Sequence, residues 1–184
     1  MVQKTILVTG SNGQLGSDIK ALAGRYPDFN FLFTDRATLS ITDEAAVNRF
    51  FEAHQPDFCV NCAAYTAVDK AEDVAEFSNV QALNADAVGY LARACAAHNT
   101  KLIHVSTDYV FEGNGTEPYK ETDATQPVSV YGITKLEGER QAAEFTDAII
   151  IRTAWVYSTF GKNFVKTMIR LMTEKPQINV VSDQ

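Results

Sequence analysis

Short hydrophobic runs alternate with longer segments of helical periodicity along most of the chain. Runs rich in β-branched and aromatic residues predict strands, the first beginning at Ile6 and the others at 31–34, 58–61, 102–106, 148–151 and 178–181. Hydrophobic residues recurring every three or four positions predict helices between them. This alternation is typical of a doubly wound parallel sheet, the Rossmann-type α/β fold, with helices on both faces.

The helices predicted from this pattern differ in length and in their end signals. The first begins near Asn12 or Gly13, and the second spans 43–54 with Thr42 as its N-cap. A long helix has an apolar face that runs from Val80 to Cys95. Two further helices are expected at 129–145 and 163–174, and a polar loop containing Gly and Pro fills 108–127.

Three glycines spaced three apart, Gly10, Gly13 and Gly16, join the first strand to the first helix. Residues without Cβ let the backbone turn sharply and let a pyrophosphate approach it closely. The helix that begins near Asn12 or Gly13 points unpaired N–H groups and a positive dipole end at that anion. The segment therefore predicts a dinucleotide site.

The second strand ends beside a carboxylate and a guanidinium. Asp35 follows the glycines by about 20 residues, the position at which a carboxylate accepts hydrogen bonds from a ribose. Asp35 favours a free ribose 2′-hydroxyl and hence NAD, whereas Arg36 beside it suits a 2′-phosphate. We favour NADPH, with NADH as the alternative.

The next two strands deliver small and polar residues to the same edge of the sheet. Ala63 and Ala64 begin a run of residues that lets a cofactor lie against the backbone, and Thr107 and Asp108 follow the strand at 102–106.

Tyr131 and Lys135 lie four apart and share one face of a predicted helix. A lysine cation, together with an oxidised nicotinamide, would lower the pKa of the tyrosine. Tyr131 could then protonate a carbonyl oxygen as a hydride reaches its carbon, with Thr107 bonded to the same oxygen and Lys135 to the nicotinamide ribose. Such a pair alone is usually an exposed surface pair, but with the glycine loop and the Ser-Thr-Asp strand end it favours a catalytic role.

Composition excludes several kinds of partner. The formal net charge of −7 argues against nucleic acid and against a polybasic membrane anchor. The sequence starts directly with a strand and has no apolar run long enough to span a bilayer, so we expect a cytoplasmic protein. Cys59 and Cys62 lie three apart in a strand and point to opposite faces, which favours small buried side chains over a metal or redox site.

Three further residues could have either a functional or a structural role. Asn84, on the apolar face of its helix, orders the fourth strand's backbone or a water near the site, or has a local structural role. Trp155 stacks on a substrate or packs, and we favour the site because the residue follows the fifth strand. Arg152 suits a diphosphate and a structural ion pair equally. His54, His98 and His104 show no ligand spacing.

The motifs together resemble the extended short-chain dehydrogenase/reductase family. These are the Thr9-Gly10-x-x-Gly13-x-x-Gly16 loop, Ser106-Thr107-Asp108 and Tyr131-x-x-x-Lys135. Longer strings are similar to the dTDP-4-dehydrorhamnose reductases within it: NCAAYTAVDKAE at 61–72, STDYVF at 106–111, VYGITK at 130–135 and RTAWVY at 152–157. The resemblance covers essentially the whole chain.

The resemblance implies NAD(P)H-dependent reduction of the C4 ketone of dTDP-4-dehydro-L-rhamnose to dTDP-L-rhamnose. It assigns Thr107, Tyr131 and Lys135 to catalysis, and Thr107, Asp108 and Trp155 to the sugar nucleotide. Cofactor contacts are implied for Gly13, Gln14 and Leu15 in the loop and for Ala64, Tyr65 and Thr66 after the third strand. A homodimer is possible, and no metal site is assigned.

Two other functions stay open at this stage. A sugar-nucleotide epimerase or epimerase-reductase would use the same Tyr131 and Lys135. A non-catalytic protein like the regulatory subunit of methionine adenosyltransferase would bind the dinucleotide and a partner without turnover. Because the family's chains continue into a smaller region that closes over the sugar nucleotide, we expect 1–184 to be the dinucleotide-binding domain, ending where that substrate-binding region begins.

Overall fold

The computed structural model describes residues 3–180. Its parallel sheet contains β1 (Lys4–Thr9), β2 (Phe29–Phe33), β3 (Phe58–Asn61), β4 (Lys101–Thr107) and β5 (Ile149–Thr153). The strands lie in the order β2-β1-β3-β4-β5, and all four pairings are parallel. The predicted doubly wound α/β fold is confirmed.

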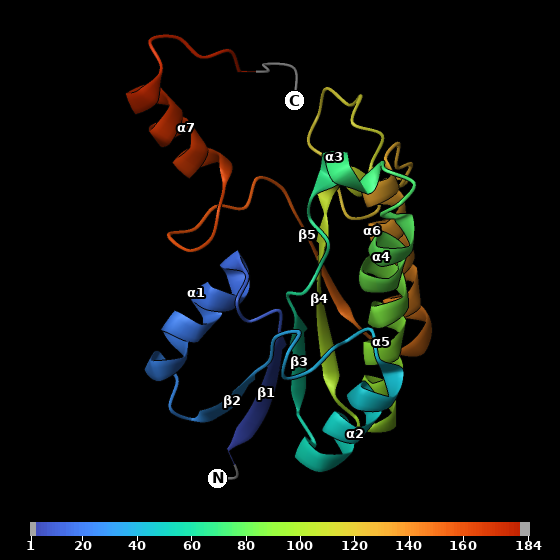
Figure 1. The fold of residues 1–184 in the computed structure, drawn as a ribbon. Helices are drawn as coiled ribbons and strands as arrows, with labels where there is room; N and C mark the ends of the chain where they lie inside the picture. Colours follow the sequence, from blue (N-terminus) through green and yellow to red (C-terminus); the bar gives the residue numbers. More distant parts are fainter. Residues whose placement is uncertain (1–2, 181–184) are drawn as a thin grey trace.

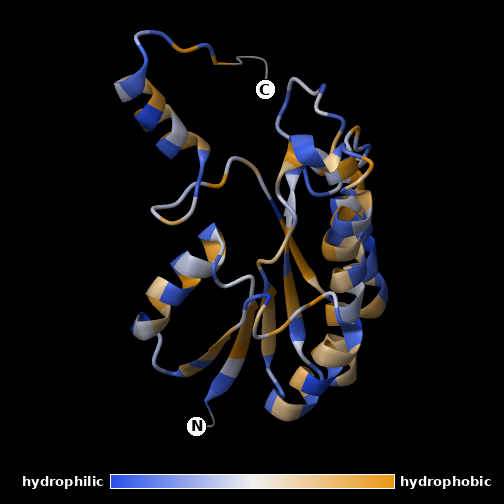
Figure 2. Ribbon diagram, viewed as in Figure 1, coloured by the Kyte–Doolittle hydropathy of each residue, from blue (hydrophilic) through white to orange (hydrophobic). Residues whose placement is uncertain are grey.

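Helices cover both faces of this sheet, as Figure 1 shows. α1 (Gln14–Leu22) lies on one face, and α2 (Glu44–His54), α5 (Ala87–Ala97) and α6 (Val130–Phe145) lie on the other. The main core forms between the strands and the second group, around Leu7, Phe51, Cys59, Leu91 and Leu102, all fully buried. Figure 2 shows this arrangement as hydrophobic strands between helices of mixed hydropathy.

The remaining helices are short or lie away from this core. They are α3 (Val68–Ala71), α4 (Phe77–Gln81) and α7 (Phe164–Glu174), with single turns of 3-10 helix at Ala23–Arg25 and Asp108–Val110. α7 buries none of its residues, although Asn163 caps its N-terminus by accepting a bond from Lys166 N. Within residues 3–180, no helix is long and apolar enough to cross a membrane.

Several predicted boundaries were wrong. The N-cap of α2 is Asp43, whose Oδ1 accepts from Ala46 N at 3.0 Å, and Thr42 lies one residue before this N-cap. β5 starts and ends later than predicted, because Arg152 and Thr153 pair with Ser106 and Thr107 of β4.

The strand predicted at 178–181 is also wrong over the residues that the structure describes. Residues 178–180 form no strand, and Val181 lies outside the described residues. Residues 178–180 therefore pair with no strand of the described sheet, although the segment is hydrophobic.

The predicted long helix is interrupted. Its turn at Ala82–Asp86 is π-helical, between α4 and α5, and holds Asn84 and Ala85 buried. Such a turn inserts one residue into the helical ladder and re-aims the side chains that follow, often beside a functional site. Hydrophobic spacing alone does not reveal it.

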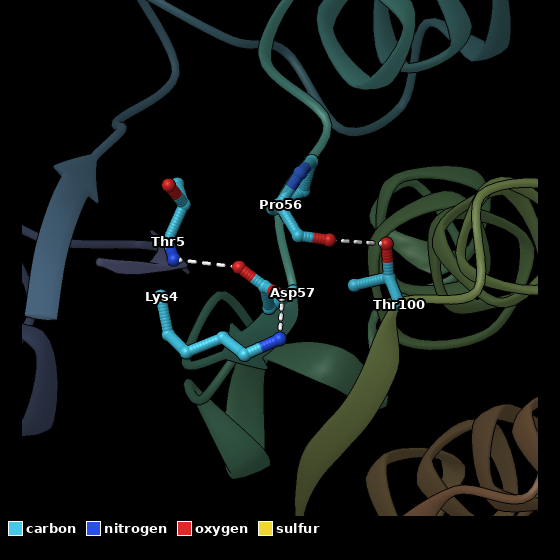
Figure 3. Close-up of polar contacts among 5 residues, drawn as sticks. All are labelled: Lys4, Thr5, Pro56, Asp57 and Thr100. Atoms are coloured by element: carbon cyan, nitrogen blue, oxygen red, sulfur yellow. Dashed lines mark hydrogen bonds and ion pairs between the residues drawn. The ribbon is translucent and has the colours of Figure 1, made fainter. Parts of the chain in front are cut away.

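Polar contacts fix the amino ends of three strands. The Asp57 carboxylate accepts from Thr5 N at 2.8 Å and pairs with Lys4 Nζ at 2.6 Å, and Thr100 Oγ1 donates to the Pro56 carbonyl (Figure 3). These bonds hold β1, β3 and β4 in register at one edge, so their carboxyl ends meet at the opposite edge, where the predicted site residues lie.

Candidate active site

Two glycines of the loop, Gly10 and Gly16, are packed too closely for side chains. Gly10 has a φ of +64°, and a Cβ on it would lie 2.7 Å from Ala63 Cα. A Cβ on Gly16 would lie 2.5 Å from the Gly10 carbonyl oxygen. The glycines therefore bring the loop against the segment after β3 and bring α1 against the loop, the arrangement expected from their spacing.

The start of α1 leaves its backbone donors available. Gly13 is the N-cap and makes no side-chain cap bond, and the first turn contains no acidic residue. Unpaired N–H groups and the positive end of the helix dipole therefore lie next to the glycine loop. This arrangement fits the pyrophosphate of a dinucleotide.

A pocket of about 830 Å³ opens beside this loop. Eight of the predicted cofactor residues line it: Gly10, Asn12, Gly13, Asp35, Arg36, Ala63, Ala64 and Tyr65. The other predicted cofactor residues do not line it: Gln14, Leu15, Gly16, Thr66, Tyr131 and Lys135. The structure adds lining residues that the sequence did not predict as cofactor contacts. These are Ala37 and 39–42 after the second strand, Cys62 after the third, Glu76 at the N-cap of α4, Asn79 in α4, and Ala82 and Leu83 in the π-helical turn.

The Asp35 carboxylate is already engaged within the chain. Its Oδ1 accepts from Ala37 N, Thr38 N and Thr38 Oγ1 at 2.9–3.0 Å, and its Oδ2 accepts from Asn12 Nδ2 at 2.7 Å. These bonds lower the pKa of Asp35 below its ordinary value, and the bonds from Thr38 have the largest effect. Arg36, next to it, is exposed at the pocket wall.

Asn84 has a local structural role. From the π-helical turn it accepts from Tyr65 N at 2.8 Å and donates to the Tyr65 carbonyl at 3.2 Å and to Thr134 Oγ1. It therefore orders the segment after β3, not the backbone of the fourth strand. The side chain of Tyr65 is fixed as well, through a bond from its hydroxyl to Glu76.

The predicted catalytic residues meet at the carboxyl edge of β4. Thr107 ends that strand, and Tyr131 and Lys135 lie on α6, which packs against it. Tyr131 is 9% exposed and Lys135 is 2% exposed, which contradicts the interpretation as an exposed surface pair. Thr107 Oγ1 donates to Asp108 Oδ1 at 3.0 Å, so both predicted substrate residues on this strand end lie together.

Lys135 makes its contact with the sheet. Its Nζ donates to the Val105 carbonyl at 2.6 Å. Burial lowers the pKa of Lys135 to about 8, against an opposing effect of Glu139.

The pKa of Tyr131 is shifted in the direction opposite to the one expected from the sequence. Burial raises the pKa of Tyr131 above its ordinary value, while the Thr107 hydroxyl acts in the opposite direction. A lowered value was expected from a lysine cation together with an oxidised nicotinamide, and in this structure Lys135 contacts a backbone carbonyl. The phenol is therefore held in its protonated form, the form that can donate a proton.

Arg152 forms a structural ion pair. Its guanidinium makes bonds to both oxygens of Glu139, the shortest at 2.7 Å from Nη2, and that carboxylate is only 5% exposed. Trp155 is 57% exposed and packs edge to face on Phe164, with ring centroids 5.0 Å apart. The structure thus places Trp155 on the side of α7 and not in the pocket.

The matches to known proteins agree with this geometry. The model of the RmlD substrate binding domain family matches residues 4–184. The chain belongs to this family. Its sequence is 42% identical to a dTDP-4-dehydrorhamnose reductase of Aggregatibacter actinomycetemcomitans over 180 residues, which cover 97% of this chain and 60% of that protein. The resemblance drawn from the sequence motifs is confirmed.

Two solved structures of the RmlD type show the same fold. A dTDP-4-dehydrorhamnose reductase from Clostridium acetobutylicum superposes with a TM-score of 0.92 at 43% identity, covering 98% of this chain and 63% of that one. The enzyme from Bacillus anthracis, solved in complex with NADP, gives 0.94 at 37% identity, covering 99% and 64%. The chain spans about 60% of the length of the curated RmlD relatives that it matches.

Proposed function

We propose that this RmlD-family chain supplies the cofactor domain and catalytic residues of a reductase that converts the C4 ketone of dTDP-4-dehydro-L-rhamnose to dTDP-L-rhamnose. The observation that carries the proposal is the pairing of two features at one sheet edge. A pocket of about 830 Å³ opens at the glycine loop. The buried Tyr131, Lys135 and Thr107 do not line it but meet at the carboxyl end of β4, in the same sheet. Relatives of this chain are dTDP-4-dehydrorhamnose reductases.

NADPH is the cofactor that the pocket supports best. The Asp35 carboxylate already accepts four hydrogen bonds, which reduces its capacity for ribose hydroxyls. The exposed Arg36 guanidinium is available for a 2′-phosphate. NADP is bound in the relative from Bacillus anthracis.

The residues have separate roles in this proposal. When bound, the reduced nicotinamide supplies a hydride. Tyr131, held protonated by burial, gives its phenolic proton to the ketone oxygen, and the Thr107 hydroxyl hydrogen-bonds the same oxygen. Lys135 holds the nicotinamide ribose and stabilises the phenolate that remains. Asp108 and Trp155 stay predicted substrate contacts, and a cytoplasmic location and a homodimer stay predictions.

The deciding experiment measures NADPH oxidation with dTDP-4-dehydro-L-rhamnose, in a chain extended to the length of the RmlD relatives. Tyr131→Phe removes only the phenolic oxygen, so we expect kcat to fall by about 100-fold or more. The Kd for NADPH should change by no more than about twofold, because that oxygen makes little cofactor contact. Equal losses in kcat and NADPH affinity would contradict the role of Tyr131 as proton donor.

The same assay separates the alternatives. Turnover of an epimerase substrate without net NADPH oxidation would favour an epimerase. NADPH binding without turnover of any sugar nucleotide, together with stoichiometric capture of a synthetase, would favour the regulatory-subunit function.

A further inference from the structure

A row of buried polar side chains crosses the sheet next to residues that line the pocket. It runs from Thr9 on β1 through Asn61 on β3 to His104 on β4, and each of the three is at most 1% exposed. The first contact joins Thr9 Oγ1 to Asn61 Oδ1 at 2.6 Å, and the second joins Asn61 Nδ2 to His104 Nδ1 at 3.1 Å. None of these three residues has a role in the proposed catalysis.

The backbone fixes the direction of this row. Ala63 N–H can only donate, and it points to Asn61 Oδ1 at 3.2 Å. The same oxygen accepts from Thr9, so the amide nitrogen of Asn61 faces His104 Nδ1 and donates to it. His104 Nδ1 is therefore an acceptor, and the ring proton lies on Nε2.

The row connects the two loops that form the floor of the pocket. Thr9 precedes Gly10, and Ala63 lies so close that a Cβ on Gly10 would be 2.7 Å from its Cα. Asn61 binds both Thr9 and Ala63 through one oxygen, which sets the spacing of these loops. On the other side of the amide, His104 Nδ1 accepts from Asn61 Nδ2 and so completes the hydrogen bonds of this buried side chain.

The other side of His104 lies next to the catalytic lysine. His104 Nε2 and Ser106 Oγ are buried and have no hydrogen-bond partner among residues 3–180. The two residues are two apart on β4 and share one face of the strand. Lys135 donates to Val105, the residue between them, and its charge acts on His104.

A water molecule suits these two atoms. It would accept from His104 Nε2–H and donate to Ser106 Oγ, and buried polar groups are commonly satisfied in this way.

We propose that His104 is a positioning residue for the dinucleotide pocket. Its Nε2-protonated ring fixes the Asn61 amide that holds Thr9 and Ala63 together, and its Nε2–H binds an internal water shared with Ser106 Oγ. The effect on cofactor affinity rests on the proposed function, whereas the tautomer and the water do not.

The first test is nitrogen NMR of the histidine-labelled chain, with His104 assigned by elimination in His54→Gln and His98→Gln variants. We expect His104 to be protonated on Nε2 and to show a cross peak between Nε2–H and a long-lived water. In Asn61→Asp the carboxylate can only accept, so the ring proton should move to Nδ1. A proton on Nδ1 in the unsubstituted chain, or a missing water cross peak, would overturn the assignment.

The second test is NADPH affinity, measured by titration. His104→Leu leaves the buried Asn61 Nδ2 without its acceptor and removes the support on that side of the amide, so the Kd should rise by about tenfold. His98→Gln, at a half-buried histidine that does not line the pocket, is the control and should leave the Kd unchanged. An equal Kd for a folded His104→Leu variant would overturn the positioning role. Failure of the unsubstituted chain to bind NADPH would count against the proposed function, and the NMR result would still decide the tautomer.

Discussion

Lys135 is a buried ammonium group that donates a hydrogen bond to the backbone carbonyl of Val105. Its pKa is lowered to about 8 in the folded chain from an ordinary value of 10.5. The unfolded chain therefore binds more protons than the folded chain between these two pH values, and folding becomes more favourable as the pH rises through that window. Below pH 8 the whole cost of burying the charge is present.

This cost can be measured against a variant without the charge. The free energy of unfolding of the unsubstituted chain, relative to Lys135→Met, should increase by up to about 3 kcal/mol between pH 8 and pH 10.5. Urea unfolding of both chains at several pH values gives the difference. A difference that is constant with pH would show that the folded lysine keeps its ordinary pKa.

Arg36 should decide the choice of cofactor. Arg36→Ala removes the cation beside Asp35, so we expect the Kd for NADPH to rise by about tenfold while the Kd for NADH changes little. Titrations with both dinucleotides check this ratio. Equal weakening of NADPH and NADH would show that Arg36 does not contact the 2′-phosphate.

Residue chemistry was predicted more easily than residue contacts. Gly10, Gly13 and Asp35 were found because their spacing in the sequence reflects the loop that they build. The engagement of Asp35 by Asn12 depends on side-chain rotamers that spacing does not encode. The raised pKa of Tyr131 depends on burial by distant segments, which is a tertiary property.

Among the helices, α6 packs closely against the π-helical turn. A Cβ on Gly138 of α6 would lie 2.2 Å from the Asn84 carbonyl oxygen. Asn84 in turn holds the backbone of Tyr65, so this contact links α6 to the wall of the pocket.

Gly138→Ala should therefore destabilise the chain, although alanine is the better helix former. We expect a loss of about 1–3 kcal/mol in the free energy of unfolding, because a backbone oxygen cannot move away without shifting the turn. Gly24→Ala is the control, since a Cβ there meets nothing within 4 Å. Similar stabilities for the two variants would mean that α6 and the turn adjust at little cost.

Periodicity predicted the elements well and their ends poorly. It gave β3 its observed bounds and placed α6 and α7 to within a residue, because their hydrophobic pattern is long or sharply bounded. It missed the π-helical turn, since one inserted residue barely changes the spacing from Val80 to Cys95. Residues 178–180 are hydrophobic enough for a strand, but a strand also needs a neighbour to pair with.

On the scale of the whole molecule, the pocket is built from four segments that are far apart in sequence. The glycine loop, the end of β2, the segment after β3 and the start of the interrupted helix all contribute to its lining. The first three were predicted because strand ends meet at one edge of a parallel sheet. The fourth was missed, since nothing in its sequence shows that the helix turns toward the pocket.

The central claim is that this pocket binds a dinucleotide, and calorimetric titration of the chain with NADPH tests it most directly. We expect saturation at about one NADPH per chain. Gly13→Val should abolish binding while circular dichroism stays unchanged, because Gly13 lines the pocket at the open end of α1 with a φ of −75° that valine can adopt. No saturable heat from a folded unsubstituted chain, or equal binding by Gly13→Val, would contradict the account.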